Sequence, residues 1–372
     1  MNTIQIINDN IHLIRHQDLW IEETAVDQLR YTAKLAGMLK VCGMPDLHPG
    51  RTYPIGAAFF TMDKIYPALV GGDIGCGMSL WQTELPRRQN LDKLEKNIGN
   101  IDKELSSEQA EQLLGYFPKT EANGTIGAGN HFAEIVQIEH IFQYEQAEQL
   151  NIDENKLQLI VHSGSRGLGG EILRAYLSQF NYEPLNANSE EANKYFQQHN
   201  LALDYAVENR LLIAQRIFHN LKTTGTQLVD IFHNFIEQTT INGQTGYLHR
   251  KGAAASDKQF AIIPGSRGSF SYLVATKPND LALNSIAHGA GRKWKRSDCQ
   301  GRLSSKFTSE QLKRTKYKSR VICEDKDLLY EEAPQAYKDI ESVITALTDA
   351  DIIQPIVRFM PVLTYKKRAN NE

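Results

Sequence analysis

The stretch Leu69-Val-Gly-Gly-Asp-Ile-Gly-Cys-Gly-Met78 places four glycines around two side chains that can bind a metal ion, Asp73 and Cys76. A run this rich in glycine forms neither a stable helix nor a regular strand, so it predicts tight turns where the backbone approaches another group closely. The apolar residues 65–70 predict a buried strand leading into it. A carboxylate and a thiolate together suit a borderline divalent ion such as Mn²⁺ or Zn²⁺. The alternative is a buried cysteine beside a turn-forming aspartate, because free cysteine is often buried.

The composition is that of a globular protein with a sizeable core: 372 residues, of which 41% are hydrophobic and 23% charged. The net charge of −3 argues neither for nor against a polyanionic partner. Residues 292–320, however, carry eleven Lys and Arg against only Asp298 and Glu310. Such a run is either a solvated surface or a surface for anions, and it directly follows a candidate catalytic histidine, His288.

The four cysteines, at positions 42, 76, 299 and 323, form no Cys-x-x-Cys pair, and the N-terminus has no basic-then-apolar signal pattern. No apolar run approaches the length that spans a membrane. We therefore expect a cytoplasmic protein that does not associate with membranes. In a reducing compartment Cys76 is available as a thiolate rather than held in a disulfide.

Hydrophobic periodicity predicts helices over residues 22–38, 190–221 and 336–347, and strands over residues 80–84, 135–138, 157–161, 227–235 and 352–365. Residues 44–56 are typical of a loop, whose Asp46 and His48 either form turns or line a site. The histidines of the long helix, His199 and His219, are interpreted as surface or core positions. Glycine-rich motifs occur without a linker from residue 43 to residue 291, so one site draws on the whole chain. This favours an α+β fold in which residues 1–372 form a single large domain of mixed β-sheets with flanking helices.

Four histidines resemble Asp73 and Cys76 in lying beside glycine or at the end of a strand-like run: His131, His162, His233 and His288. One such histidine is usually structural, but four are difficult to explain independently. Histidine, carboxylate and a bridging thiolate together suit two transition-metal ions. Because neither a GxxxxGK[ST] motif nor a protein-kinase motif set is present, phosphates would be held by glycine-turn amides, Ser and Arg.

These motifs resemble those of the RtcB-type RNA-splicing ligases, from about Met44 to the C-terminus. In the family's order they are Met44-Pro-Asp-Leu-His-Pro-Gly50, Gly72-Asp-Ile-Gly-Cys-Gly77, Gly129-Asn-His-Phe-Ala-Glu134, His162-Ser-Gly-Ser-Arg-Gly167, His233-Asn234, His249-Arg-Lys-Gly-Ala253, Pro264-Gly-Ser-Arg-Gly-Ser-Phe-Ser271 and His288-Gly-Ala-Gly-Arg292. The resemblance implies the RtcB-like fold and a ligase that joins RNA 3′-phosphate or 2′,3′-cyclic phosphate ends to 5′-hydroxyl ends, in RNA repair or tRNA splicing. It implies GTP and two Mn²⁺ ions as cofactors, broken RNA ends as substrate, and allows for an activating protein factor.

The resemblance also implies a role for each matching residue. His288 would be the nucleophile that forms a covalent histidine–GMP, from which an RNA-3′-pp-G end is made. The implied metal ligands are Asp73, Cys76, His131, His162 and His233, with the sulfur bridging. The implied GTP pocket consists of Asn130, Glu134, Asn234, Pro264, Gly265, Ser266, Ser271, His288, Gly289, Ala290, Gly291 and Lys366, with Glu134 and Lys366 reading guanine. The implied RNA-phosphate contacts are Arg166, Lys251, Arg292 and Arg296.

The chain departs from the family pattern at a few positions. Arg267 stands where the family usually has methionine, and Lys295 where serine is common. Lys366 is the better match for the guanine-reading lysine, but Lys367 follows it directly.

Two alternatives use the same residues: a two-metal phosphoesterase acting on RNA ends, and a non-catalytic RNA-end-binding protein. Only a ligase must become guanylylated.

Overall fold

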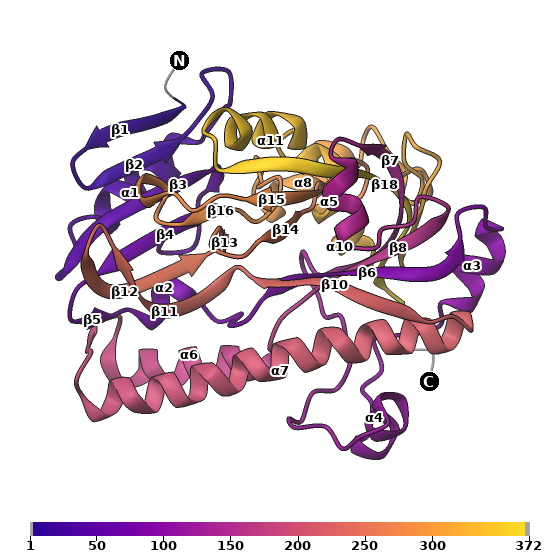
Figure 1. Ribbon diagram of the computed structural model, residues 1–372, viewed down its shortest axis with the longest axis horizontal. Coiled ribbons are helices and arrows are strands. Elements are labelled where there is room, and N and C mark those ends of the chain that lie inside the picture. The colour runs from indigo at the N-terminus through magenta and orange to yellow at the C-terminus, as the bar shows by residue number, and fades with distance from the viewer. Residues whose placement is uncertain (1–2, 369–372) are drawn as a thin grey trace.

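The computed structural model describes residues 3–368, and two β-sheets carry its fold (Figure 1). In spatial order the first sheet consists of β1 (Ile4–Asn8), β2 (Ile11–Ile14), β3 (Met38–His48), β4 (Ile55–Thr61), β12 (Gln244–Lys251) and β11 (Asn234–Ile241). The second consists of β10 (Gly225–Phe232), β6 (Gly77–Pro86), β8 (Lys156–Ser163), β7 (Phe132–Ile141), β18 (Ile353–Lys367), β15 (Ser271–Thr276) and β14 (Phe260–Ile263), with β17 (Arg320–Cys323) parallel to β18. Two short pairs join β13 (Ala253–Ala255) to β16 (Ser285–Ala287) and β5 (Lys64–Ile65) to β9 (Leu185–Asn186).

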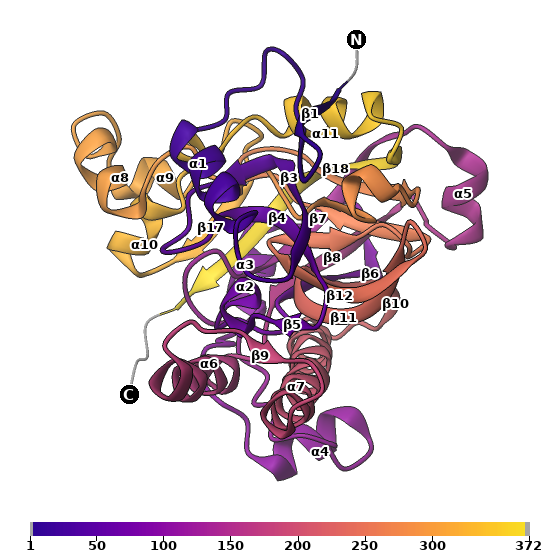
Figure 2. The same cartoon turned by 90° about the vertical axis from the view of Figure 1, so that its left-hand side faces the viewer.

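Helices cover the outer faces of these sheets (Figures 1 and 2). They are α1 (Glu23–Thr32), α2 (Pro67–Val70), α3 (Leu91–Asn97), α4 (Ser107–Leu114), α5 (Tyr144–Gln149), α6 (Gly167–Phe180), α7 (Glu190–Leu221), α8 (Arg296–Leu303), α9 (Ser309–Leu312), α10 (Lys326–Glu331) and α11 (Ile340–Asp349), with 3₁₀ turns at Asp280–Ala282 and Pro334–Ala336. None of the helices in residues 3–368 combines the length and the apolar character needed to cross a bilayer.

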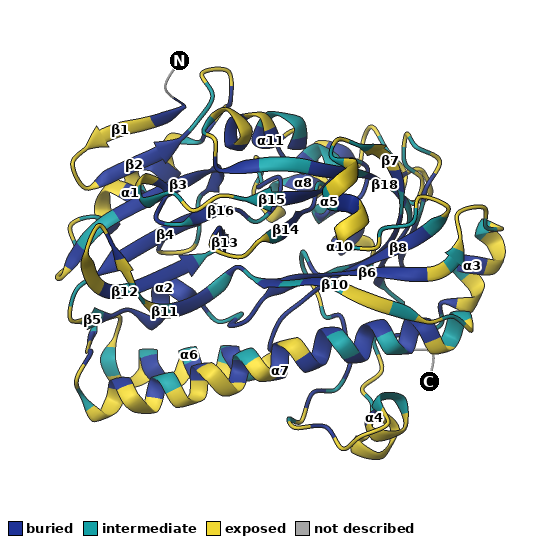
Figure 3. Ribbon diagram, viewed as in Figure 1, coloured by how far each residue is buried: buried dark blue, intermediate teal, exposed yellow. Residues whose placement is uncertain are grey.

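The long helix α7 runs beneath both sheets, with α6 beside it (Figure 1). Its first half packs into the apolar cluster of the first sheet and its second half into that of the second sheet. Its outer face is exposed, as the alternating colours in Figure 3 show. The Ser189 side chain caps its first turn by accepting a hydrogen bond from the Ala192 amide. The predicted helix over residues 190–221 is therefore confirmed, because its amphipathic pattern matches a single buried face.

The two histidines of α7 lie where the sequence predicted. His199 is fully buried, and its Nε2 accepts a hydrogen bond from the Ile236 amide at 3.2 Å. His219 is exposed near the end of the helix. Neither lines the main cavity.

A third apolar cluster lies between the sheets and joins them. It contains Cys42 and Ala58 from the first sheet and Met78, Ile160 and Val357 from the second, each 1% exposed or less. Fully burying a side chain of the size of Met78, Ile160 or Val357 contributes about 1.5–3 kcal/mol, so this shared core stabilises the packing of the two sheets against each other. The predicted α+β class is confirmed, while the single domain over residues 1–372 stays a prediction.

Three local predictions were wrong in part. Of residues 65–70 only Ile65 is in a strand, β5, and Pro67 begins the short helix α2, since proline lacks the amide a strand needs and its fixed φ suits a first helical turn. Residues 44–48 belong to β3 rather than to a loop, because the strand continues past a register shift. The predicted strand over residues 227–235 is interrupted at His233, where the chain passes from the second sheet to the first.

Candidate functional site

Four of the predicted metal-binding side chains lie where four strands of the second sheet begin or end, on the same side of the sheet. Cys76 precedes β6, His131 precedes β7, His162 lies near the end of β8, and His233 follows β10. The neighbouring strands β10, β6, β8 and β7 are antiparallel, so the starts of β6 and β7 meet the ends of β8 and β10. Residues far apart in the sequence are thereby brought to one place.

The glycine-rich turn before β6 approaches its neighbours as closely as the sequence predicted. Gly75 has a φ of +72°, and a Cβ there would lie 2.7 Å from the Cβ of Ala206 in α7. Its amide donates to the Asn234 carbonyl at 2.9 Å. Only glycine combines this backbone conformation with so little space. The turn places Asp73 and Cys76 beside these strand ends.

Helix α7 fixes this turn through a buried arginine that the sequence analysis missed. Nη1 of Arg210 donates to the carbonyls of Gly75 at 2.9 Å and Ser163 at 3.0 Å. The rest of the guanidinium binds the Asp230 carboxylate, at 2.9 Å from Nε to Oδ2 and 2.5 Å from Nη2 to Oδ1. One arginine thus ties the Cys76 turn and the end of the His162 strand to the same helix. Amphipathic periodicity alone marks this position only as part of a buried face.

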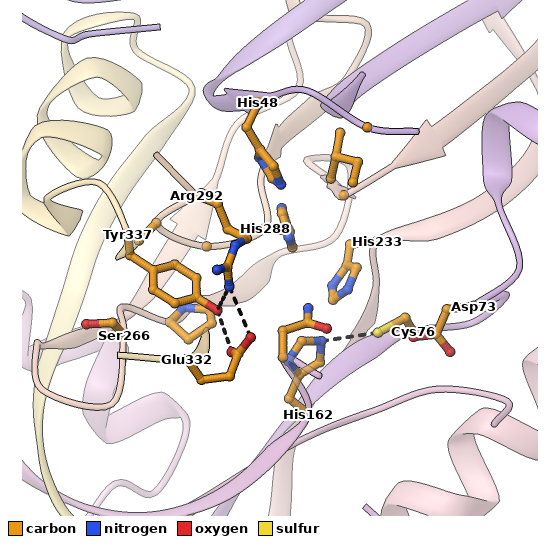
Figure 4. A pocket seen from close by; sticks show the side chains of 18 of the residues that line it. His48, Asp73, Cys76, His162, His233, Ser266, His288, Arg292, Glu332 and Tyr337 are labelled. Atoms are coloured by element: carbon orange, nitrogen blue, oxygen red, sulfur yellow. Dashed lines mark hydrogen bonds and ion pairs between the residues drawn. The ribbon is translucent and has the colours of Figure 1, made fainter. Parts of the chain in front are cut away.

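The five predicted ligands lie close together, and Figure 4 shows four of them, Asp73, Cys76, His162 and His233. The Cys76 sulfur lies 3.2 Å from Nε2 of His131 and 3.1 Å from Nε2 of His162. Oδ2 of Asp73 lies 2.7 Å from Nε2 of His131. The ring of His233 is 5.1 Å from that of His162, measured between centroids. Within residues 3–368, the donor atoms of Cys76, His131 and His162 all lie within 4.8 Å of one another, which is close enough to hold one metal ion.

Hydrogen bonding fixes the orientation of the His131 ring. Nδ1 of His131 lies 3.0 Å from the Ile126 carbonyl, which can only accept, so Nδ1 carries a hydrogen. Nε2 of the same ring lies 2.7 Å from Oδ2 of Asp73 and therefore points into the cluster. A ring with one nitrogen bonded to a backbone carbonyl and the other directed at the site is the arrangement typical of metal-binding histidines.

The electrostatics of the cluster agree with this donor set. Burial raises the pKa of the Cys76 thiol well above its usual value, and the nearby Asp73 carboxylate adds to the effect. Burial likewise holds the pKa values of His162 and His233 well below normal, with neighbouring histidines contributing. The imidazoles of His162 and His233 are then neutral at physiological pH, as metal binding requires, and a divalent ion would displace the Cys76 thiol proton.

A cavity of about 640 Å³ opens beside the cluster, between the two sheets. It is lined by all the predicted GTP-pocket residues except Ser271, namely Asn130, Glu134, Asn234, Pro264, Gly265, Ser266, His288, Gly289, Ala290, Gly291 and Lys366. Ser271 lies behind the wall, where its Oγ accepts from the Gly265 amide at 3.4 Å. Of the predicted RNA-phosphate contacts, Lys251, Arg292 and Arg296 line the cavity, whereas Arg166 does not and instead donates to Thr125.

His288 projects into this cavity between the rings of His48 and His233 (Figure 4). Its Nδ1 lies 2.6 Å from Oδ2 of Asp46, although the ring is not aligned with that oxygen as a hydrogen-bond donor. Asp46 is fully buried in β3, and His48 lines the cavity. Of the two interpretations of this segment, the structure favours a site.

A buried lysine, Lys338, hydrogen-bonds to the backbone of the strand that carries Asp46. Nζ of Lys338 donates to the carbonyls of Pro45 at 3.0 Å and Leu47 at 2.7 Å, on either side of Asp46. Burial lowers the pKa of Lys338 to about 8, and the Asp46 charge opposes that shift. The lysine therefore fixes the backbone on both sides of the carboxylate.

A second buried carboxylate, Glu332, organises the opposite wall and was missed by the sequence analysis. It accepts from Nη1 of Arg292 at 3.0 Å and from the Tyr337 hydroxyl at 2.5 Å (Figure 4). It also lies 3.4 Å from Nζ of Lys366. Burial opposes ionisation, but Lys366 and Arg292 lower the pKa of Glu332 to about 2. Its sequence surroundings, Glu332-Ala-Pro334, show no periodic pattern that would have indicated a buried site residue.

The choice between Lys366 and Lys367 is decided by β18, where successive side chains point to opposite faces of the sheet. Lys366 lines the cavity and donates to the Gly129 carbonyl at 2.8 Å, whereas Lys367 pairs with Asp325 at 3.2 Å outside it. Glu134 is buried near Lys366 and accepts from the Thr364 hydroxyl at 2.5 Å. Burial raises the pKa of Glu134 to about 8.

The two departures from the family pattern both lie at the cavity wall. Arg267 is buried, and its Nη2 donates to the Leu329 carbonyl at 2.9 Å. Lys295 is exposed. A third basic residue, Lys251, is held against the Ala68 carbonyl at 3.1 Å, and burial lowers its pKa to about 8.

Comparisons with known proteins agree with the motifs. The profile of the family described as tRNA-splicing ligase RtcB matches residues 28–116 and 116–367. The chain is 49% identical to the RNA-splicing ligase RtcB2 of Escherichia coli over 98% of its own length and 97% of the relative's. It is 28% identical to the tRNA-splicing ligase RtcB of Nanoarchaeum equitans, over 93% and 92% of the two chains. It is also 28% identical to the RNA-splicing ligase RtcB of Escherichia coli K12, over 93% and 95%. On the strength of this profile match and of near-complete coverage at 49% identity, the chain belongs to the RtcB family.

Proposed function

We propose that this protein is a GTP- and Mn²⁺-dependent RNA ligase that joins RNA 3′-phosphate or 2′,3′-cyclic phosphate ends to 5′-hydroxyl ends. The observation that carries the proposal is the placement of His288, whose Nδ1 faces the buried Asp46 carboxylate at 2.6 Å, in a cavity beside the Cys/His cluster. The names of the relatives, RNA-splicing and tRNA-splicing ligases, support RNA as the substrate. RNA repair and tRNA splicing are the contexts we propose, in the cytoplasm.

His288 would act as the nucleophile. Nδ1 would carry the ring proton beside the Asp46 carboxylate, which leaves the lone pair of Nε2 for the attack. A bond forms from Nε2 to the α-phosphorus of GTP while the bond from that phosphorus to the β-phosphate bridging oxygen breaks, so pyrophosphate leaves. Asp46 would stabilise the charge that develops on the imidazole.

RNA would then receive and release the nucleotide. An oxygen of the RNA 3′-phosphate attacks the histidine-bound phosphorus, giving RNA-3′-pp-G and free His288. The 5′-hydroxyl attacks the RNA 3′-phosphorus, so the phosphodiester forms and GMP leaves. A 2′,3′-cyclic end would first take up one water to become a 3′-phosphate. We propose Lys251, Arg292 and Arg296 as contacts of the RNA phosphates, and Arg166 from the resemblance alone.

Asp73, Cys76, His131, His162 and His233 would hold two Mn²⁺ ions, with the sulfur shared. Five protein ligands are few for two ions unless one bridges, and a thiolate disfavours Mg²⁺, which prefers oxygen. Bound there, the ions would neutralise charge on the transferring phosphate.

Glu134 and Lys366 would read the guanine base. An ionised carboxylate accepts from the N1–H and the exocyclic amino group of guanine, and an ammonium donates to O6, whereas adenine mismatches both. An unpaired buried polar group costs about 1–3 kcal/mol, so GTP should be preferred over ATP roughly tenfold or more. Equal adduct yields from the two nucleotides would refute this assignment.

Incubation with α-labelled GTP and Mn²⁺, followed by denaturing electrophoresis, tests the proposed function. A ligase retains label on the protein, in an acid-labile and alkali-stable bond, and His288→Ala loses it while keeping its metal. A phosphoesterase would carry no label but release phosphate from RNA ends. An RNA-end-binding protein would do neither.

A further inference from the structure

The basic segment recognised in the sequence folds as a small lobe, residues 293–318, that comprises α8 and α9. Figure 2 shows α8 and α9 at one side of the molecule, beside α10. Its apolar side chains turn inward: Leu303 and Leu312 are buried in a cluster with Leu328 of α10, and Phe307 packs against them. The lobe therefore has its own apolar support, and its charged side chains remain on the outside.

Within residues 3–368, most of these charges have no carboxylate partner, although Lys293, Arg302 and Lys316 lie over aromatic rings of the lobe. Exposed basic residues of the lobe are Lys293, Lys295, Arg296, Arg302, Lys306, Arg314, Lys316 and Lys318. Of these, only Arg296 lies within 4 Å of a carboxylate in the described part of the chain. The acidic Glu310 is already paired with Lys313 at 2.8 Å. So many cations without a carboxylate partner on one small lobe repel one another, and a polyanion would relieve that repulsion.

The lobe is continuous with the cavity. Lys293, Trp294, Lys295 and Arg296 line the cavity wall, and α8 leads outward from them. The Trp294 ring is half-buried: it packs against the apolar cluster of the lobe and keeps an exposed part, with Nζ of Lys293 at 5.6 Å and Cζ of Arg302 at 5.1 Å from its centroid. An aromatic face among cations, next to a basic track, is the arrangement that binds single-stranded nucleic acid.

We propose that the lobe 293–318 binds the single-stranded RNA that leads out of the cavity from the 3′-phosphate end. Trp294 stacks on a base just outside the cavity, and Lys306, Arg314 and Lys316 contact phosphates further along the strand. A duplex keeps its bases stacked internally and offers none to Trp294, which favours a single strand. The inference rests on the proposed function, because it assumes that an RNA end occupies the cavity.

The test is equilibrium binding of 3′-phosphate RNA by fluorescence anisotropy, without GTP. Two single strands are compared, one of about 4 and one of about 12 nucleotides, which spans the usual site sizes. The lobe variant is Lys306→Gln/Arg314→Gln/Lys316→Gln. The matched control is Lys103→Gln/Lys119→Gln/Lys258→Gln, which removes the same charge from exposed positions outside the lobe.

The wild type should bind the longer strand more tightly than the shorter one, and the lobe variant should lose this advantage. Each lost phosphate contact lowers the slope of log affinity against log salt by about 0.7, so the triple variant should lose about 2. Trp294→Leu should weaken binding of the longer strand about tenfold, and Trp294→Tyr should restore most of it.

The inference is overturned if the two triple variants lose affinity equally, if neither does, or if the wild type shows no advantage for the longer strand. It is also overturned if a polyglutamate peptide displaces the RNA from wild type and Trp294→Leu equally well, since the lobe would then bind any polyanion. Failure of the proposed function appears separately, as absence of the labelled protein adduct while RNA still binds.

Discussion

Oδ2 of Asp46 lies 2.6 Å from Nδ1 of His288, and this contact joins β3 of the first sheet to the turn after β16. Gly291 makes room for it, because a Cβ at that position would lie 2.3 Å from the Asp46 carbonyl oxygen and 2.8 Å from its Cβ. Gly291 also has a φ of +73°, which favours glycine. The carboxylate is therefore built into the site and is not a surface group that happens to lie nearby.

Asp46→Asn should reduce histidine guanylylation roughly 100-fold or more, the size of effect typical of losing a group that assists proton and charge handling. The amide is isosteric with the carboxylate, so folding and metal content should be retained. The rate of adduct formation from labelled GTP is the measurement, with Asp18→Asn as an exposed control. An unchanged rate would show that Asp46 only supports the strand.

Cys76→Ser should remove bound Mn²⁺ and abolish adduct formation, because a hydroxyl is a far weaker ligand than a thiolate. Cys42→Ser, Cys299→Ser and Cys323→Ser should keep both properties. Metal content by mass spectrometry is the clearer readout, since Cys76 is 1% exposed and burial alone would shield it from alkylating reagents. Mg²⁺ alone should support little adduct. A Cys76→Ser protein that binds two Mn²⁺ ions would contradict the proposed metal site.

Glu134 should make the folded protein less stable as pH rises. Burial raises its folded pKa to about 8 from an ordinary value of 4.5, so between these values the folded state binds more protons than the unfolded state. The contribution of Glu134 to the free energy of unfolding is therefore fully present below pH 4.5 and is lost as the pH rises toward 8. Glu134→Gln, which stays neutral, should therefore gain stability relative to wild type between pH 5 and pH 8.

Denaturant unfolding at the two pH values measures this difference. The exposed Glu145→Gln serves as the control and should leave the gap unchanged. A constant difference between wild type and Glu134→Gln at both pH values would mean that Glu134 is ionised throughout.

Arg210→Met should destabilise the protein by about 3–5 kcal/mol, the usual cost of leaving one member of a buried ion pair alone. Its guanidinium is fully buried, and its loss also frees the carbonyls of Gly75 and Ser163. Equilibrium unfolding in urea is the measurement. Lys194→Met, which breaks an exposed ion pair at the other end of the same helix, should change the midpoint little. Equal effects of the two substitutions would argue against this role for Arg210.

The sequence by itself determined the helix over residues 190–221 and the chemical types gathered at the site. Periodicity sets which face of a helix is buried, and it is a local property. The glycine turn around Asp73 and Cys76 was predictable for the same reason, because glycine next to a metal-binding side chain is visible without knowing the fold. The histidines at strand ends were predictable in the same way, whereas their meeting at one site was an inference from their number.

Only the tertiary structure decided how these parts meet. Asp46 faces His288, Arg210 holds the Cys76 turn, and Glu332 ties Arg292 to the cavity wall through contacts between segments far apart in the chain. His233 interrupts a strand-like run because one side of it pairs in the second sheet and the other side in the first. Pairing partners and buried charges depend on which surfaces pack together, and a single sequence records the side chains but not their neighbours across the core.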